Sequence, residues 1–338
     1  MRQKTKIYSS IIVTYRCNAR CNMCEVWKNP SKPSEEIGLT EIKKLPQTSF
    51  TNITGGEPFI RQDLPEIVEI LKRKTKRIVI STNGYFTDRI VSLCEKYPNI
   101  GIRISIEGLP KTNDEIRGIP DGFDRGLRTL LRLRAMGIKD IGFAMTVQDS
   151  NCRDLLPLYH LAKGLGYEFA TATVHNSQYF HKWDNKIDDK ELVCGELKKL
   201  VKEFLRSKRP KDWFRAYFNW GLINYIYENK RFLACDMGKN DFFVDPWGVV
   251  LACNGMDEKQ AMGNLKTQSW DEIWNSRQAQ EVRQMVKSCQ RNCWMIGNVA
   301  PAMRDNLKIP ITWILKNKLR LFLNKGLNLN LNNRCIKK

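Results

Sequence analysis

The stretch IYSSIIVTYRCNARCNMC, residues 7–24, joins an apolar run to three closely spaced cysteines. The run is rich in β-branched residues and predicts a buried β-strand. Cys17, Cys21 and Cys24 follow directly at the carboxyl end of that strand. Thiolates are good ligands for iron, and a [4Fe-4S] cluster normally takes four of them. Three cysteines therefore predict a cluster in which one iron stays open for a small bidentate ligand.

A zinc site is the alternative for clustered cysteines. It would require paired CxxC units with a fourth Cys or His nearby. Cys17 has no partner of that kind, and the next cysteine after Cys24 is Cys94. The spacing therefore favours iron at this place.

The composition limits the class of protein. Apolar residues make up 42% of the 338 residues, which is enough for a substantial core, so a disordered protein is excluded. We find neither a secretory signal nor an apolar run of roughly 20 residues that could span a membrane. We therefore expect a cytoplasmic protein, in which eleven cysteines indicate metal binding more than disulfides. The net charge of +20 favours anionic partners, although a plain solvated basic surface explains it equally well.

Six short β-branched runs alternate with helical stretches in the first half of the chain. The runs are IYSSIIVTY (7–15), FTNIT (50–54), RIVIST (77–82), IGIRISIE (100–107), IGFAMTV (141–147) and EFATATVH (168–175). This alternation predicts an α/β fold with a parallel sheet and helical crossovers. Six units are fewer than the eight of a complete barrel, so a partial barrel or an open sheet fits. In both, the chemistry lies at the carboxyl ends of the strands.

We divide the chain into four parts. Residues 1–185 form the α/β part, and the charged, aromatic residues 186–232 form a predicted helical bridge. Residues 233–300 carry four cysteines among short predicted strands and a helix, as in a small α+β domain. Residues 301–338 form a basic amphipathic tail with nine Lys or Arg against one acidic residue.

The turn TNITGGEP, residues 51–58, follows the second predicted strand. Its two glycines let the backbone approach a ligand closely, and Glu57 adds a carboxylate that could hold an ammonium group. Together with the cysteines one strand earlier, this turn resembles the signature of the radical SAM superfamily, CxxxCxxC after the first strand and a GGEP-like turn after the second. The resemblance covers residues 7–175 and implies a partial (β/α)6 barrel of the TIM type.

The same resemblance implies the cofactor contacts. Cys17, Cys21 and Cys24 would bind the reducing [4Fe-4S] cluster, with S-adenosylmethionine (SAM) on the open iron. The residues that would hold the amino group of SAM are Gly55, Gly56 and Glu57. Candidates for its ribose are Ser105 and Glu107 at the end of the fourth strand, with Ser81 and Asn83 as weaker candidates at the third. For these last four, ordinary strand-end capping is the alternative.

One position departs from the family pattern. An aromatic residue usually precedes the third cysteine, and this chain has Met23 there. Methionine is apolar and adaptable, so it can still pack at this position. Trp27 is the candidate to replace the aromatic contact with adenine.

The second group of cysteines resembles the SPASM extension of radical SAM enzymes. Twelve residues separate Cys235 from Gly248, four more lead to Cys253, and Cys289 and Cys293 follow after a GNL…SWDEIWNS stretch. A full SPASM module has seven cysteines, so four resemble the shortened form, often called a twitch domain, with one auxiliary [4Fe-4S] cluster. Four thiolates saturate such a cluster, which favours an electron relay. A structural zinc site and a purely structural cluster are the alternatives. For most of Cys94, Cys152, Cys194 and Cys335, a buried or unligated thiol is expected.

By resemblance, the reduced cluster cleaves SAM to a 5′-deoxyadenosyl radical, which abstracts a hydrogen atom from a C–H bond of the substrate. We expect an anionic substrate, such as a nucleotide sugar or a precursor of envelope glycans or lipids, and a reaction of the oxidoreductase, epimerase or dehydratase type. A ribosomal peptide is the first alternative, although the early position of Cys17 leads us to expect no leader-binding domain before it. RNA is the second, but we find no RNA-binding motif. A flavodoxin or ferredoxin, attracted by the basic surface, would donate the electron.

The tail predicts a contact with a membrane surface or with the protein itself. In a helical arrangement, one face gathers Ile311, Ile314, Leu315, Leu319 and Phe322, and basic residues surround it. Such a helix suits an anionic membrane interface, which would make the protein peripheral at the inner face of the membrane. Docking on the protein's own barrel is the commoner use of an amphipathic helix.

Overall fold

A single sheet organises the chain in the computed structural model, which describes residues 7–256 and 258–329. Within these residues the strand order is β6-β5-β4-β3-β2-β1-β7-β8-β9. The strands are β1 (Tyr8–Ile12), β2 (Phe50–Thr54), β3 (Ile78–Thr82), β4 (Gly101–Ser105), β5 (Ile141–Val147), β6 (Glu168–Thr173), β7 (Asp241–Val244), β8 (Val249–Leu251) and β9 (Gly263–Asn264).

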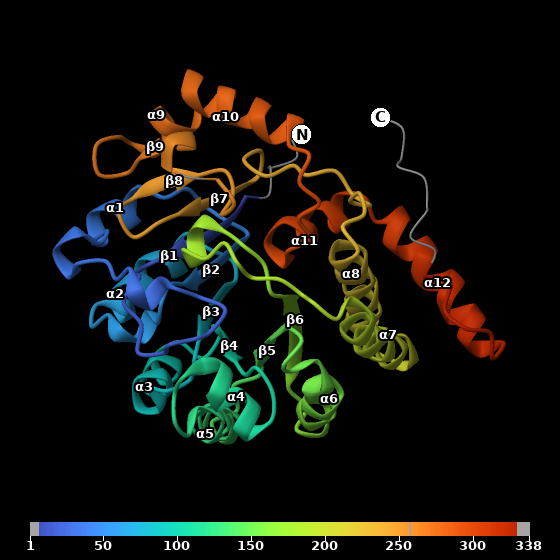
Figure 1. Ribbon diagram of the computed structural model, residues 1–338. Coiled ribbons are helices and arrows are strands. Elements are labelled where there is room, and N and C mark those ends of the chain that lie inside the picture. Colours follow the sequence, from blue (N-terminus) through green and yellow to red (C-terminus); the bar gives the residue numbers. More distant parts are fainter. Residues whose placement is uncertain (1–6, 257, 330–338) are drawn as a thin grey trace.

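The first six strands pair in chain order, and all five pairings are parallel. Helices connect them, as the alternation of runs predicts, and Figure 1 shows α2, α3, α5 and α6 along the outer side of the curved sheet. The predicted α/β fold with a partial barrel is therefore confirmed. The helices are α1 (Leu39–Lys44), α2 (Leu64–Lys72), α3 (Thr87–Lys96), α4 (Pro110–Arg117), α5 (Gly122–Ala135), α6 (Leu155–Gly164), α7 (Lys190–Arg206), α8 (Pro210–Ile226), α9 (Trp270–Trp274), α10 (Arg277–Ser288), α11 (Ile296–Asp305) and α12 (Lys308–Phe322).

The two faces of the six-stranded part have opposite character. The face toward the helices is buried and mainly apolar, and its side chains include Ile11, Ile53, Ile80, Ile102, Ile104, Phe143 and Phe169. The register places small residues on the opposite face, which we call the lumen face: Ser10, Asn52, Ser81, Ser105, Ala144, Thr146, Ala170 and Ala172. All eight are half-buried. These short, half-buried side chains contrast with the bulky, packed interior of a complete barrel.

Ion pairs close the amino-terminal end of the lumen face. Arg103 on β4 contacts Asp140 with an N–O distance of 2.5 Å, and Glu168 at the start of β6 accepts from three cations. Those cations, Arg209, Lys211 and Arg215, precede or begin α8. We call this group the floor of the lumen.

The second cysteine region continues the same sheet. β7 pairs in parallel with β1, with Tyr8 opposite Asp241, and β8 then returns antiparallel. The turn between them closes at Gly248, whose φ of 86° favours glycine, while the Asp245 carboxylate accepts from the amides of Trp247 and Val249. The predicted strands of this region are confirmed. Their parallel pairing with β1 is a feature that the sequence analysis did not anticipate.

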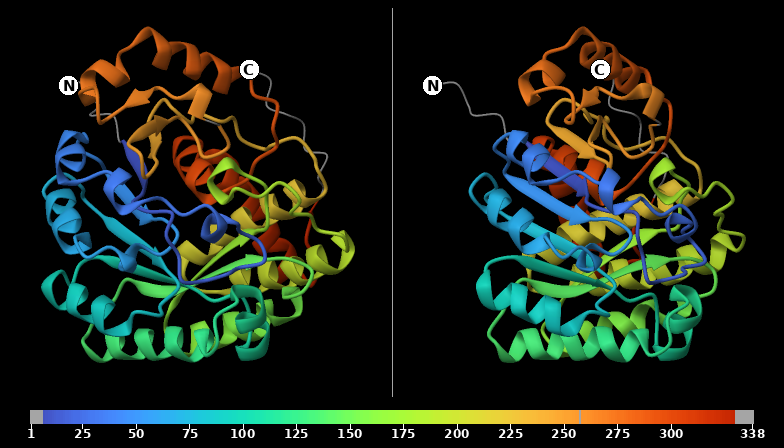
Figure 2. Two further views of the ribbon diagram at one scale, coloured as in Figure 1. Left: turned by 60° about the vertical axis from the view of Figure 1, so that its left-hand side comes forward. Right: turned by 90° about the vertical axis from the view of Figure 1, so that its left-hand side faces the viewer.

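The tail forms α12, which lies along α7 and α8 on the side of the molecule away from α2 and α3 (Figures 1 and 2). Trp313 and Ile314 are buried there, and the Trp313 ring stacks on Trp220 at 4.9 Å between centroids. Ile314 thus belongs to the docked face and not to the exposed one with Ile311. None of the described helices is long and apolar enough to cross a bilayer.

Of the four cysteines expected to be unligated, Cys94, Cys152 and Cys194 are fully buried. Cys335 lies outside the described residues.

Candidate active site

The three cysteines of the first motif lie in one loop at the carboxyl end of β1. All three thiols are free and half-buried. Burial raises the pKa of Cys17 to about 12 and that of Cys24 to about 11, and a charge on Cys21 would raise both further because the thiols are close together. The loop therefore presents three neighbouring thiols that iron can deprotonate, which fits a cluster.

The double-glycine turn lies directly against this loop. The amide of Gly56 donates to the Thr14 carbonyl at 2.7 Å, and that of Glu57 to the Arg16 carbonyl at 2.9 Å. A Cβ on Gly56 would lie 2.3 Å from the Arg16 oxygen. Only glycine allows this contact, so the turn and the cysteine loop form one rigid cradle.

Glu57 is fully buried and joins two strand ends. Its carboxylate accepts from the amides of Phe59 and Asn83 and from the hydroxyl of Thr82. Burial raises the pKa of Glu57, and these three donors oppose the rise. Three donors leave part of the carboxylate's accepting capacity open, so it can still take the proposed ammonium group.

Asn83 extends this network to the cysteine loop. Its side-chain amide donates to Asn18 Oδ1 at 2.8 Å, whereas Asn18 Nδ2 is buried without a partner in the described structure. A buried donor without a partner is costly, and a bound ligand could accept from it. Asn18 was not among the predicted site residues, although its place between two of the cysteines is a usable signal.

The candidate ribose residues take different positions. Ser105 is half-buried on the lumen face, and Ser81 Oγ donates to Asn52 on the same face. Glu107 is 1% exposed; it pairs with Arg117 at 3.1 Å and accepts from the Thr146 amide. Burial raises the pKa of Glu107, and Arg117 opposes the rise. Contact of these residues with ribose stays a prediction.

Arg117 is the main site residue that the sequence analysis missed. It ends α4 and lies close enough to Cys17, Cys21 and Glu57 to oppose the rise of their pKa values. The end of α4 is held against the cysteine loop, because the Arg20 amide donates to the Arg117 carbonyl at 3.0 Å. A cation thus lies between the thiols and both buried carboxylates. The sequence did contain a signal for Arg117. It precedes Gly118, a glycine that caps the helix after the fourth strand.

The loop after β6 covers the cradle. Tyr179 donates its hydroxyl to the Gly55 carbonyl at 2.7 Å and contacts Thr54, and the Phe180 carbonyl accepts from the Glu25 amide. A small cavity of about 20 Å³ lies between Tyr15, Tyr179, His181 and the β7–β8 region. The loop after β6 therefore lies between the end of β1 and the β7–β8 region.

The Met23 position packs as expected. Met23 is 9% exposed and contacts Ile116 and Val174. Trp27 donates its indole N–H to the Cys24 carbonyl at 3.0 Å, which ties it to the cysteine loop. Its contact with adenine remains a prediction.

The second group of cysteines also gathers. Burial raises the pKa of Cys253 to about 11, with further increases from Cys235 and Cys293, and Cys293 in turn is close to Cys289. Within the described residues, no three Cys, His, Asp or Glu side chains are close enough to hold one metal ion. A cluster does not need that spacing, because its thiolates bind separate irons around a cube.

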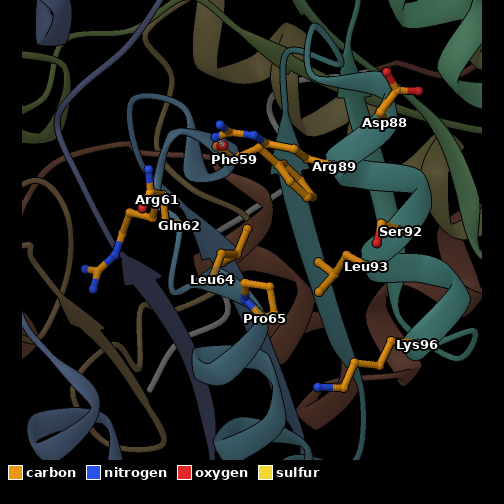
Figure 3. A pocket seen from close by; sticks show the side chains of 10 residues that line it. All are labelled: Phe59, Arg61, Gln62, Leu64, Pro65, Asp88, Arg89, Ser92, Leu93 and Lys96. Atoms are coloured by element: carbon orange, nitrogen blue, oxygen red, sulfur yellow. Dashed lines mark hydrogen bonds between the residues drawn. The ribbon is translucent and has the colours of Figure 1, made fainter.

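A larger cavity lies elsewhere. Its volume is about 450 Å³, and Figure 3 shows its lining between Arg61, Leu64 and Pro65 on one side and Arg89, Leu93 and Lys96 of α3 on the other. Its cations are engaged: Arg61 pairs with Asp63, and Arg89 donates to the Phe59 carbonyl. No predicted site residue lines it, so we do not assign the chemistry there.

Comparison with known families supports this geometry. A model of the radical SAM superfamily matches residues 11–161, and a model of the SPASM iron-sulfur cluster-binding domain matches residues 235–294. The chain belongs to the radical SAM superfamily. As a radical SAM enzyme with a SPASM-type domain, it uses SAM and two [4Fe-4S] clusters. The cradle of Cys17, Gly56 and Glu57 fits the first cluster and SAM, and the four gathered thiols fit the second.

The chain is similar to curated proteins with different names and activities. Fe-coproporphyrin III synthase of Methanosarcina barkeri is 34% identical over 158 residues, 44% of this chain and 39% of its own. The subtilosin biosynthesis protein AlbA of Bacillus subtilis is 25% identical over 288 residues, 80% of this chain and 60% of its own. GTP 3′,8-cyclase of Aquifex aeolicus is 24% identical over 302 residues, 82% of this chain and 92% of its own. The chain thus spans less than two thirds of the first two relatives.

Solved structures show the same fold. The structure described as native anSMEcpe with bound AdoMet and Kp18Cys peptide superimposes with a TM-score of 0.64. It covers 94% of this chain and 99% of its own at 14% identity. The barrel and the second cysteine region are therefore shared over nearly the whole length.

Proposed function

We propose that this radical SAM enzyme abstracts a hydrogen atom from a C–H bond of a small, anionic, hydroxyl-rich substrate, such as a nucleotide sugar or a lipid-linked or envelope-glycan precursor. The reaction would be of the oxidoreductase, epimerase or dehydratase type, with the auxiliary cluster as an electron relay. The lumen face is the observation that carries the proposal.

Small and polar side chains line that face below the cofactor cradle. Serine, threonine and asparagine there offer hydrogen bonds, and alanines leave space, whereas an apolar substrate would leave these groups without partners. A sugar or nucleotide can satisfy them along its length.

The charge of the floor supports an anionic substrate. Its four cations, Arg103, Arg209, Lys211 and Arg215, lie against two acids, Asp140 and Glu168. Burial lowers the pKa of Lys211, Glu168 opposes this, and Arg215 and Arg103 lower it further. An anionic group at the floor would relieve this repulsion between cations.

The chain's own residues have separate tasks in this proposal. When bound, SAM and the reduced cluster supply one-electron cleavage of a carbon–sulfur bond and hydrogen-atom abstraction. Glu57 and the backbone of Gly55 and Gly56 orient the amino group of SAM. Arg117 balances the negative charge of the thiolates, and the Tyr179 loop helps to exclude water from the cradle.

Similarity to AlbA over 80% of this chain favours a second candidate, a peptide substrate. Similarity to a GTP cyclase over 82% of this chain favours the anionic small molecule instead. We further propose a flavodoxin or ferredoxin as electron donor, attracted by the net charge of +20. A cytoplasmic location with one face at the inner membrane surface completes the proposal.

Release of 5′-deoxyadenosine tests the proposal. The anaerobically reconstituted and reduced enzyme would be given SAM with separate pools of nucleotide sugars, lipid-linked sugars, peptides or tRNA. We expect a sugar pool to raise release, and Arg103→Gln to lower that response while leaving slow release without substrate unchanged. Stimulation by peptides or tRNA alone would overturn the substrate class.

A further inference from the structure

The outer face of α12 carries a continuous apolar stripe. Its large side chains are 40%, 61%, 58% and 83% exposed at Ile311, Leu315, Leu319 and Phe322. They recur every three or four residues, so they share one side of the helix. The helix packs on α7 and α8 with its opposite side. The buried residues on that side are Pro310, Trp313, Ile314 and Asn317.

The charge around the stripe is of one sign. The described residues 306–329 contain five Lys or Arg and no Asp or Glu. Lys308 and Lys316 are exposed on α12 itself. Two copies of this stripe facing each other would bring like charges together, which disfavours self-association.

We propose that the outer face of α12 inserts into the interface of an anionic membrane, with Ile311, Leu315, Leu319 and Phe322 as the inserted side chains. Exposed apolar side chains enter the boundary between headgroups and acyl chains, and flanking lysines bind anionic headgroups. Because α12 is held by Trp313 in the core, the whole enzyme would follow it to the surface. This proposal does not rest on the substrate proposed above.

Vesicle flotation of the full chain tests the proposal. We expect the protein to float with vesicles of equal parts phosphatidylglycerol and phosphatidylcholine and to stay behind with phosphatidylcholine alone. Changing Ile311, Leu315 and Phe322 together to serine should weaken binding by at least about tenfold, and Lys308→Gln with Lys316→Gln should weaken it less.

Leu131→Ser and Met285→Ser form the matched control. These side chains are 46% and 47% exposed on α5 and α10, outside α12, and should leave flotation unchanged. Unfolding curves of all variants would verify that they fold. Failure of the unchanged chain to float, or equal flotation of the triple-serine variant, overturns the proposal. A dimer in solution that the triple-serine variant dissociates would also overturn it, by assigning the stripe to a second copy.

Discussion

Arg117 Nη1 lies 3.1 Å from Glu107 Oε1, and the two side chains are only 12% and 1% exposed. The same guanidinium is close to Cys17, Cys21 and Glu57. One cation therefore compensates a cluster of acids that the protein has buried under its cofactor loop.

Replacing this cation should be costly. Arg117→Gln would leave Glu107 buried without its counter-charge, and we expect a loss of about 3 kcal/mol in unfolding free energy. Urea unfolding of the chain without clusters measures it. Arg117→Gln combined with Glu107→Gln should be more stable than Arg117→Gln alone; equal stability would show that the pair is not coupled.

Gly221 on α8 is expected to tolerate no side chain. A Cβ there would lie 1.9 Å from the Trp294 ring, next to Cys293. Gly221→Ala should therefore lower the unfolding free energy by about 2 kcal/mol or more through overpacking. Gly195→Ala is the control, since a Cβ at this position of α7 meets nothing within 4 Å. It should stabilise the helix by about 0.5–1 kcal/mol, and similar effects of the two changes would contradict the packing described for α8.

Arg231 should tune the auxiliary cluster. Its guanidinium donates to the carbonyls of Cys293 and Leu233, and its remaining nitrogen, Nη2, is buried without a partner in the described structure. A nearby cation and hydrogen bonds to sulfur stabilise the reduced, more negative cluster. Arg231→Gln should lower the midpoint potential by tens of millivolts in a redox titration followed by electron paramagnetic resonance.

Arg291 provides the comparison for Arg231. It also opposes the raised pKa of Cys293, but it is exposed and donates to the Gly255 carbonyl. Water screens its charge, so Arg291→Gln should shift the potential less. To isolate the auxiliary cluster, both variants would carry serine at Cys17, Cys21 and Cys24. Equal shifts of the midpoint potential in Arg231→Gln and Arg291→Gln would contradict a special role for the buried guanidinium of Arg231.

Asp241 makes the stability depend on pH. Burial raises its pKa to about 7, with Arg304 opposing the rise, whereas an unfolded Asp titrates near about 3.9. The folded protein thus holds a proton that the unfolded chain releases, so this residue lowers stability as the pH rises from about 4 to 7. Asp241→Asn should match the parent near pH 4 and exceed it by about 4 kcal/mol at pH 8, because each of the roughly three pKa units is worth about 1.4 kcal/mol. The same difference in unfolding free energy between variant and parent at both pH values would contradict the role of Asp241.

Local spacing accounts for the parts that the sequence predicted. The distances between Cys17, Cys21 and Cys24, and between the glycines of the GGEP turn, are contained in short segments. Each β-branched run likewise marks its own strand. These features need no knowledge of distant contacts, and all of them appear in the structure at the expected places.

The parts that the sequence did not predict depend on contacts between distant segments. Arg117 enters the site because the end of α4 meets Arg20, and Tyr179 enters because its loop crosses Gly55. The tail pattern suggested one apolar face, but Ile314 docks on the protein while Leu315 faces outward. Only the packing of α12 on α7 and α8 determines which of these two neighbouring residues is buried.

The parallel pairing of β1 with β7 joins the beginning of the chain to its last third. Residues 8–11 lie between β2 on one side and residues 241–244 on the other. A fragment ending before β7 would expose a bare strand edge next to the cysteine loop, and such edges recruit other chains. The barrel and the auxiliary region therefore cannot be exchanged independently. Replacing the auxiliary region removes β7, so a new strand would have to pair with β1 in its place.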